Sequence, residues 1–281
     1  MKPQYLVLAI AYLAAFTAPT PAAAEEQRTP VSQCQAIAQN IPKATFASFS
    51  GTAPLTPAVS EDEDVKFTFL GHSTFEIETP GGIIIATDYN GWYRPATTPD
   101  VVTMNKAHTT HFTLTPDPGI KHVLHGWSDV PGGKADIDLV VGDAYIRNVP
   151  TDIRFSYGLG GSQENGNSIF IFEIAGLCIG HLGHLHYELT DTHYIEIGRL
   201  DIVMVPVDGG LTMGADSMSR VIKRLRSSLI LPMHRRGPPV DAFVSMFGKD
   251  FDIAYATDDS ITVSMRTLPK KPLIYVLQGV R

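Results

Sequence analysis

The chain has 281 residues, 44% of them hydrophobic and 18% charged, which suits one large globular domain or two small ones. Its formal net charge of −7 at pH 7 argues against nucleic-acid binding, because nucleic-acid binders usually carry a basic face or stripe. We therefore expect a globular protein without a nucleic-acid partner.

The N-terminus has the features of a secretory signal. Lys2 gives a basic start, and the apolar run at 5–16 is shorter than the roughly 20 residues of a bilayer-spanning helix. Alanines at 22–24 supply the small residues of a cleavage site. The short run argues against the alternative, an uncleaved anchor. We expect residues 1–24 to be removed and the mature protein to be periplasmic or secreted, with no membrane span.

Export would place Cys34 and Cys178 in an oxidising compartment, where they could pair. The alternative is that Cys178, which lies in an apolar run, is a small buried residue. The sequence leaves both open, because it does not show whether the two Cα atoms come within reach.

Residues 25–64 are predicted to be a leader, with a short helix at 32–40 and a polar, proline-containing linker at 48–64. The main domain is expected over 65–281. Alternation of apolar and polar residues, and short apolar runs between turn residues, predict a series of strands. These strands are expected at 65–70, 74–78, 83–87, 101–104, 121–125, 137–149 and 153–157, followed by a Gly- and Asn-rich loop at 158–167.

The second half of the chain alternates strands with helices. Strands are predicted at 168–173, 177–179, 201–207, 229–231 and 260–265. Met218, Val221, Ile222 and Leu225 have the spacing of one helix face, and a further helix is predicted at 240–247. This pattern favours an α+β fold of two packed sheets with helices outside.

Five histidines lie at or just past the ends of predicted strands, beside turns. They are His108, His111, His181, His184 and His234. Neutral imidazole is a common ligand for zinc and related ions, and three or four convergent ligands suffice. A single His-x-x-His pair is weak evidence, but five histidines at matching strand ends predict a metal site.

These segments resemble the metallo-β-lactamase superfamily, and within it the branch of metal-dependent hydrolases that includes ascorbate-6-phosphate lactonase. The resemblance covers about 65–237. Its matching pieces are 70–75, the strand ending at Asp88, the 108–111 turn, 167–172, 176–183, 206–213 and 231–234. It implies a four-layer αββα sandwich with a metal site along one edge between the two sheets.

Three residues depart from the family's ligand motifs. Lys106 and Thr110 replace the first His and the Asp of His-x-His-x-Asp-His, and His184 replaces the Asp that follows His-Leu-Gly. Two dications beside a lysine, without these carboxylates, would repel each other strongly in a low-dielectric cleft. The departures therefore predict one metal ion rather than two.

In the family pattern, the remaining metal position would find His111, His184 and His234, a three-His set with an open water position. His108 and His181 would remain from the other position. The expected ion is zinc, with iron or manganese as alternatives.

Two charged residues that depart from the family pattern are predicted to take catalytic roles. Lys106 would hold positive charge at the lost position and stabilise a developing oxyanion, and Asp208 would act as a partner or base. The alternative for Lys106 is a solvated surface lysine. His72 is expected to shape the floor of the site without binding metal, and His186 to be structural or on the surface.

The resulting hypothesis is an exported hydrolase in which metal-bound hydroxide attacks a small ester, lactone, amide or phosphoester. One alternative is an inactive binding protein that keeps this fold. Another is a redox enzyme using iron, since histidine-rich ligands do not single out zinc. The sequence decides neither the substrate nor the oligomeric state.

Overall fold

The computed structural model describes residues 31–38, 63–154 and 161–280. The predicted signal at 1–24 and most of the leader at 25–64 lie outside these residues. The first part of the chain forms α1 (Gln33–Ala38), β1 (Val65–Gly71), β2 (Thr74–Glu78), β3 (Ile84–Ala86), β4 (Val101–Met104), β5 (His122–His125), β6 (Asp138–Val141), β7 (Ala144–Arg154), β8 (Ser162–Ile174) and β9 (Leu177–His181).

Helices enter mainly in the second part of the chain. The elements there are α2 (Asp191–Ile197), β10 (Ile202–Pro206), α3 (Ala215–Leu225), β11 (Leu229–Met233), α4 (Val240–Val244), the 3-10 helix η1 (Ser245–Asp250), β12 (Asp252–Tyr255), β13 (Ser260–Val263) and β14 (Leu273–Val276).

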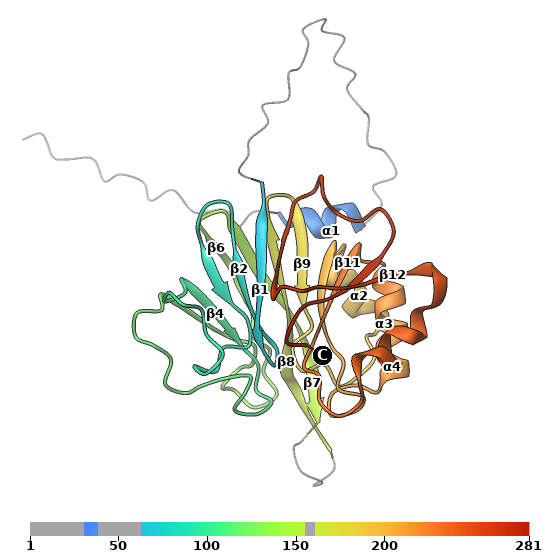
Figure 1. The fold of residues 1–281 in the computed structure, drawn as a ribbon. Helices are drawn as coiled ribbons and strands as arrows, with labels where there is room; N and C mark the ends of the chain where they lie inside the picture. Colours follow the sequence, from blue (N-terminus) through green and yellow to red (C-terminus); the bar gives the residue numbers. More distant parts are fainter. Residues whose placement is uncertain (1–30, 39–62, 155–160, 281) are drawn as a thin grey trace, which may run out of the picture.

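The described strands form two mixed sheets, which pack against each other (Figure 1). One has the order β13-β1-β2-β3-β4-β5, and the other has the order β12-β14-β11-β10-β9-β8-β7-β6. Parallel pairing joins β3 to β4 and β4 to β5 in the first sheet, and runs from β9 to β12 through β10, β11 and β14 in the second. This sandwich confirms the predicted α+β class.

The core lies between the sheets and follows the sequence pattern. In β1, Val65, Phe67 and Phe69 are buried while Lys66 is exposed, as two-residue alternation requires. The three join buried residues of β7 to β11 in one hydrophobic cluster. Strands β9, β10 and β11 are buried along their whole length, which is typical of parallel strands covered on both faces.

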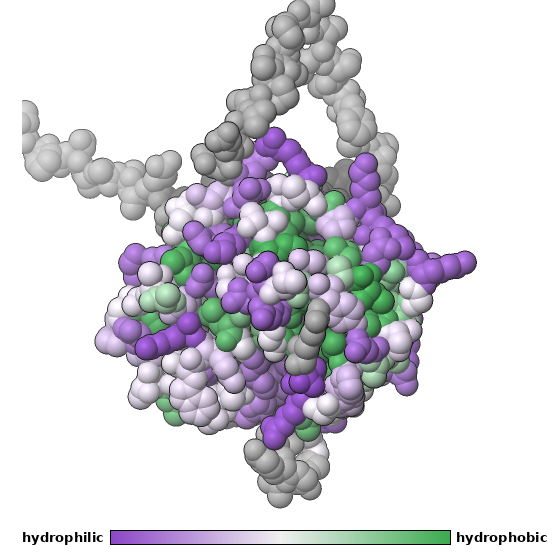
Figure 2. Space-filling model, in the orientation of Figure 1, coloured by the Kyte–Doolittle hydropathy of each residue, from purple (hydrophilic) through white to green (hydrophobic). Residues whose placement is uncertain are grey.

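The outer faces of the two sheets are covered differently. In Figure 1, α2, α3 and α4 lie on the side of the eight-stranded sheet, and the predicted apolar face of α3 is buried at Met218, Val221 and Ile222. Between β1 and β9 the described residues contain no helix. Loops cover the outer face of the first sheet instead, through a small cluster that includes Met104 and Trp127. Polar and charged side chains spread over the face seen in Figure 2, with apolar patches between them.

Several local predictions differ from the structure. The strand expected at 137–149 is a hairpin, because Gly142, with φ of 58°, turns the chain between β6 and β7. The loop expected at 158–167 overlaps the start of β8. Helix α2 and strands β12 and β14 were not predicted. Helix α2 begins with a capping box in which His193 stands where Glu or Gln gives the usual signature, so its start is hard to recognise.

The two cysteines are paired, so the structure resolves the alternative that the sequence left open. Cys34 and Cys178 form a disulfide across a sequence separation of 144 residues, with Cα atoms 5.9 Å apart. The bond joins α1 to the start of β9. None of the helices in the described ranges combines the length and apolar character needed to cross a bilayer.

Candidate metal centre

Four histidines from both sheets meet at one edge of the sandwich. They are His72, His108, His111 and His234, and one ring nitrogen of each lies within 4.8 Å of the others. His72 follows β1, His108 and His111 follow β4, and His234 follows β11. The strands deliver these side chains to a common point although they lie up to 162 residues apart in sequence (234 − 72 = 162).

The backbone at this edge is unusual in three places. His72, Asp88 and His234 have φ values of 53°, 43° and 52°, in the left-handed region that residues with a side chain rarely adopt. The N–H of His234 donates a 2.6 Å hydrogen bond to the carbonyl oxygen of His72, so the two turns support each other. Such strain costs of order 1–3 kcal/mol per residue and clusters at functional sites.

The imidazoles converge through nitrogens that have no protein partner. Among the described residues, the Nε2 atoms of His72, His111, His184 and His234 are buried and accept or donate no hydrogen bond. A buried polar group without a partner costs about 1–3 kcal/mol. The Nε2 atoms of His72, His111 and His234, whose ring nitrogens lie within 4.8 Å of one another, fit a divalent cation, which would bind their lone pairs.

Two buried carboxylates hold the other side of two of these rings. Oδ2 of Asp88 lies 2.6 Å from Nδ1 of His111, and Oδ2 of Asp208 lies 2.7 Å from Nδ1 of His234. With the proton on Nδ1, each ring presents the lone pair of Nε2 to the cluster. A carboxylate behind a ligating histidine is the usual means of fixing its tautomer and raising its basicity.

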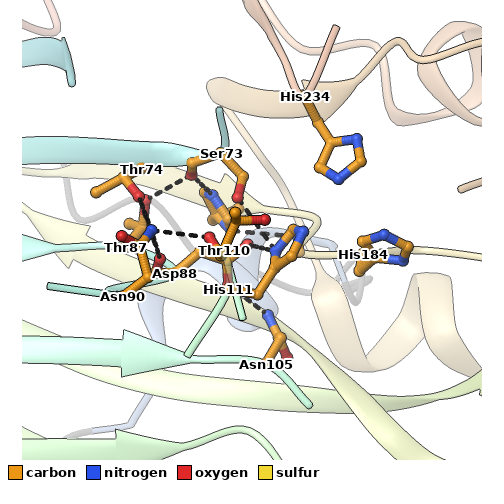
Figure 3. A network of polar contacts seen from close by, with 12 residues as sticks. Ser73, Thr74, Thr87, Asp88, Asn90, Asn105, Thr110, His111, His184 and His234 are labelled. Atoms are coloured by element: carbon orange, nitrogen blue, oxygen red, sulfur yellow. Dashed lines mark hydrogen bonds and ion pairs between the residues drawn. The ribbon is translucent and has the colours of Figure 1, made fainter. Parts of the chain in front are cut away.

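Asp88 is itself part of a buried polar network (Figure 3). The amide of Asn105 donates to Oδ1 of Asp88 at 3.0 Å, and its own oxygen accepts the N–H of Ser168 at 2.7 Å. Gly183 has to be glycine here, because a Cβ would lie 2.3 Å from the Asn105 amide nitrogen and its φ is 59°. In Figure 3 Asp88 lies on one side of His111, with His184 and His234 on the other.

Thr110, which stands at the family's Asp position, supports a neighbouring ring. Its Oγ1 lies 2.8 Å from Nδ1 of His108. A hydroxyl can form a hydrogen bond with that nitrogen without adding charge, which leaves Nε2 of His108 to face the cluster. His108 is half-buried, whereas His111 is buried.

Burial favours the neutral form of His72, His108, His111 and His184. Desolvation, reinforced by the neighbouring imidazoles, lowers the pKa of His72 to about 3 and lowers the pKa values of His111 and His184 well below the ordinary range. The pKa of His108 is lowered for the same reasons. Neutral imidazole is the form that binds metal.

The carboxyl group of Asp208 is suited to stay ionised. Burial alone would raise its pKa, but His234 and the N–H groups of Gly210 and Thr212 outweigh burial, so the pKa lies below its ordinary value. Both N–H groups donate to Oδ1 at 2.9 Å. Asp208 is therefore engaged with His234 and the backbone of its own loop.

The structure differs from the sequence-based expectation at Lys106 and His181. The side chain of the preceding Asn105 turns inward, and Lys106 is exposed, with no hydrogen bond or ion pair to any described residue. His181 is buried, but its Nε2 donates to the carbonyl of Ser73 at 2.8 Å and its Nδ1 accepts the N–H of Gly183 at 3.2 Å. Neither is brought into the cluster.

His184 lies beside the cluster but is not one of its four members. Its ring centroid lies 4.7 Å from that of His111 and 4.8 Å from that of His234. Its Nδ1 lies 2.9 Å from Nε2 of His186. It is not one of the four histidines whose ring nitrogens lie within 4.8 Å of one another.

Sequence reasoning missed three contributors: His72, Asp88 and His186. His72 was expected to shape the floor only, yet its Nε2 joins the cluster. The available signal was position, since His72 and Asp88 each follow a strand, as the other site residues do. His186 gave no such signal, because its role depends on a contact with Arg154, 32 residues away.

Known proteins of similar sequence cover most of this chain. A Pyrococcus furiosus protein named as a metal-dependent hydrolase is 26% identical over 208 residues, spanning 66% of this chain and 91% of the relative. A Polaromonas protein with the same description is 26% identical over 261 residues, spanning 73% of this chain and 86% of the relative.

Solved structures show the same fold. A Thermotoga maritima protein, described as a Zn-dependent hydrolase of the metallo-β-lactamase superfamily, is 27% identical with a TM-score of 0.55, covering 76% of this chain and 98% of its own. The metallo-β-lactamase fold protein YhfI of Bacillus subtilis is 11% identical with a TM-score of 0.52, covering 78% of this chain and 98% of its own.

Residues 66–234 match the family described as the beta-lactamase superfamily domain. This range runs from β1 to the turn after β11 and contains every histidine of the cluster. The resemblance to the superfamily that the sequence motifs indicated is confirmed, and this chain belongs to the beta-lactamase superfamily.

Proposed function

We propose that the protein is a hydrolase that depends on one divalent metal ion, held by His72, His108, His111 and His234. The observation that carries the proposal is the convergence of buried Nε2 atoms without partners. The names of the Pyrococcus and Thermotoga relatives support metal dependence and hydrolysis. This ligand set replaces the sequence-based one by adding His72 and leaving out His181 and His184.

The number of metal ions follows from the carboxylates. Asp88 and Asp208 are the carboxylates paired with these rings among the described residues, and both face Nδ1 atoms. Asp88 also accepts a hydrogen bond from the side chain of Asn105, and Asp208 accepts hydrogen bonds from backbone N–H groups. Each of their oxygens already contacts a protein donor or a ring nitrogen, and their two charges together offset one dication.

A bound divalent cation would supply Lewis acidity at this edge and lower the pKa of a water molecule there. The protein's own part is to hold the imidazoles in fixed positions. Asp88, Thr110 and Asp208 each occupy an Nδ1 atom, so the rings need not reorganise on binding. The proposed substrates are small esters, lactones, amides or phosphoesters, and the expected ion is zinc, with iron or manganese as alternatives.

We also propose that the mature protein begins after residue 24 and acts in the periplasm or outside the cell. The Cys34–Cys178 bond supports this, because disulfides persist in oxidising compartments.

The test is metal stoichiometry and affinity of residues 25–281, measured by elemental analysis and competition with a chelator. We expect one zinc per chain. His111→Ala and His234→Ala should each weaken zinc binding by more than about 100-fold. Replacing a residue that only hydrogen-bonds to a ligand already lowers metal affinity roughly 10–100-fold, and the loss of the ligand itself should cost more. His122→Ala is the matched control, since His122 lies on β5 and contacts none of these rings.

Hydrolysis is tested on a panel of one ester, one lactone, one amide and one phosphodiester. Two tightly bound ions per chain would overturn the one-metal proposal, and no bound metal would overturn the site. One bound zinc without turnover of any panel member would favour the inactive binding protein instead.

A further inference from the structure

His184 presents a problem that the four-histidine site does not solve. The residue is 5% exposed, and its Nε2 is buried without a partner among the described residues. Its ring stands nearly perpendicular to those of His108, His111 and His234, with centroids 4.7–5.0 Å away. Whether this nitrogen carries a lone pair or a proton decides what it can do.

The proton positions can be read from a chain of contacts that begins at the backbone. The N–H of Arg154 donates a hydrogen bond of 2.6 Å to Nδ1 of His186. A backbone N–H is always a donor, so this Nδ1 is an acceptor and carries no proton. Neutral imidazole has one N–H, and in His186 it must therefore be on Nε2.

The next contact passes this constraint to His184. Nε2 of His186 lies 2.9 Å from Nδ1 of His184 and 3.1 Å from the carbonyl oxygen of Leu211. A protonated ring nitrogen has no lone pair in the ring plane, so it cannot accept a hydrogen bond from His184. Nδ1 of His184 is therefore unprotonated, whether the N–H of His186 donates to it or to the carbonyl oxygen of Leu211. The proton of His184 is then on Nε2.

A metal ligand needs the opposite arrangement. To bind a cation through Nε2, His184 would have to carry its proton on Nδ1, directly against the N–H of His186. His111 and His234 show the contrast, since a carboxylate acceptor faces their Nδ1 atoms. We infer that His184 is not a ligand but a hydrogen-bond donor, whose Nε2–H is directed to a negatively charged oxygen of the bound substrate.

This inference rests on the proposed function and specifies a catalytic residue for it. Hydrolysis of an acyl or phosphoryl group places negative charge on an oxygen in the transition state, and a fixed N–H stabilises that charge. The sequence assigned this task to Lys106, which is exposed. His184 stands where the family motif has an Asp, so the change removes a carboxylate and adds a donor.

The surroundings hold the donor in place. The N–H of His184 donates to Oδ1 of Asn167 at 2.7 Å. The guanidinium of Arg154 donates to the carbonyl oxygens of Gly210 and Leu211 at 2.9 Å each, which fixes the loop carrying the second acceptor of His186. His186 is thus a positioning residue that acts through His184.

The direct test is the tautomer of His184, measured by long-range ¹⁵N–¹H NMR on the metal-free and zinc-loaded protein. We expect Nε2–H in both forms, with Nδ1–H on His111 and His234. In His186→Phe the constraint is removed, and we expect Nδ1–H to appear on His184. An Nδ1–H tautomer in the wild-type protein would overturn the inference.

Variants supply a second, independent measurement. His184→Ala should keep zinc affinity within about threefold of wild type, unlike His111→Ala. Inorganic phosphate should bind zinc-loaded His184→Ala at least about 10-fold more weakly, since a hydrogen bond to a charged group is worth roughly 1.5–3 kcal/mol. His184→Gln, which keeps a side-chain N–H, should recover most of the loss.

The outcomes separate the inference from the proposed function. Loss of zinc from His184→Ala to the extent seen for His111→Ala makes His184 a ligand and overturns the inference. If the wild-type protein binds no zinc, the proposed function fails, and the tautomer in the metal-free protein still decides the role of His184.

Discussion

The tautomer of each ring decides what it contributes to the site. His111 and His234 are backed by carboxylates, His108 by a hydroxyl and His184 by another imidazole. A carboxylate accepts a proton and frees Nε2 to bind a cation, whereas a donating imidazole leaves the proton on Nε2. Residues of one type thereby take two chemical roles within 5 Å.

Replacing the carboxylate behind His111 should weaken the metal site without removing a ligand. Asp88→Asn keeps the size of the side chain but loses the charge that holds the Nδ1 proton. We expect zinc affinity to fall roughly 10–100-fold, measured by competition with a chelator. Asp129→Asn, at an exposed position, is the control. An affinity for Asp88→Asn within twofold of wild type would show that the pair does not support the ligand.

At the scale of elements, parallel strands and their turns make the site. Strands β4 and β11 end at one edge, and the turns after them present His108, His111 and His234. Strand β9 reaches the same edge at His181, while its other end is tied to α1 through Cys178. The disulfide therefore lies at the end of β9 away from this edge, and we expect it to support stability rather than metal binding.

Removing the disulfide should lower stability and leave the site intact. The double variant Cys34→Ser/Cys178→Ser loses the covalent link between residues 144 positions apart. Its free energy of unfolding should fall by about 2–5 kcal/mol. Urea titration followed by tryptophan fluorescence measures this change. Zinc affinity of the folded variant should equal that of the wild type, and a large drop would mean that α1 also shapes the metal centre.

At the scale of the whole molecule, burial of so many imidazoles links folding to pH. In the folded protein the pKa of His72 is about 3 and that of His186 about 4, chiefly because burial disfavours the charged form. The same groups titrate near about 6.5 in an unfolded chain. Below that pH the unfolded state binds protons that the folded state does not, so stability falls as the pH falls.

The metal-free protein should therefore unfold at lower urea concentration at about pH 5 than at about pH 7.5. The raised pKa of buried Asp88 acts in the opposite direction, but it is one group against several histidines. His186→Phe removes one of these titrating groups and should reduce the pH dependence. A urea midpoint that stays constant over this range would contradict the burial of neutral imidazoles.

The sequence predicted much of the fold because its signals are local. Alternation located β1 and β2, apolar runs located β9 and β11, and helical spacing located α3. It did not locate α2, whose capping box uses His193, or β14, whose place depends on pairing with β11 and β12. Pairing partners distant in sequence leave no mark on a single short run.

The sequence by itself predicted the strands, the helices and the α+β class, because periodicity is a property of the chain, and its resemblance to known motifs indicated the superfamily and the edge where histidines gather. Only the tertiary structure decided which nitrogens converge. Left-handed turns aim His72 and His234 inward, hydrogen bonds to Ser73 and Gly183 withdraw His181, and the N–H of Arg154 sets the proton on His184 through His186. Ring direction and tautomer depend on atoms brought together by folding, so they cannot be read from spacing.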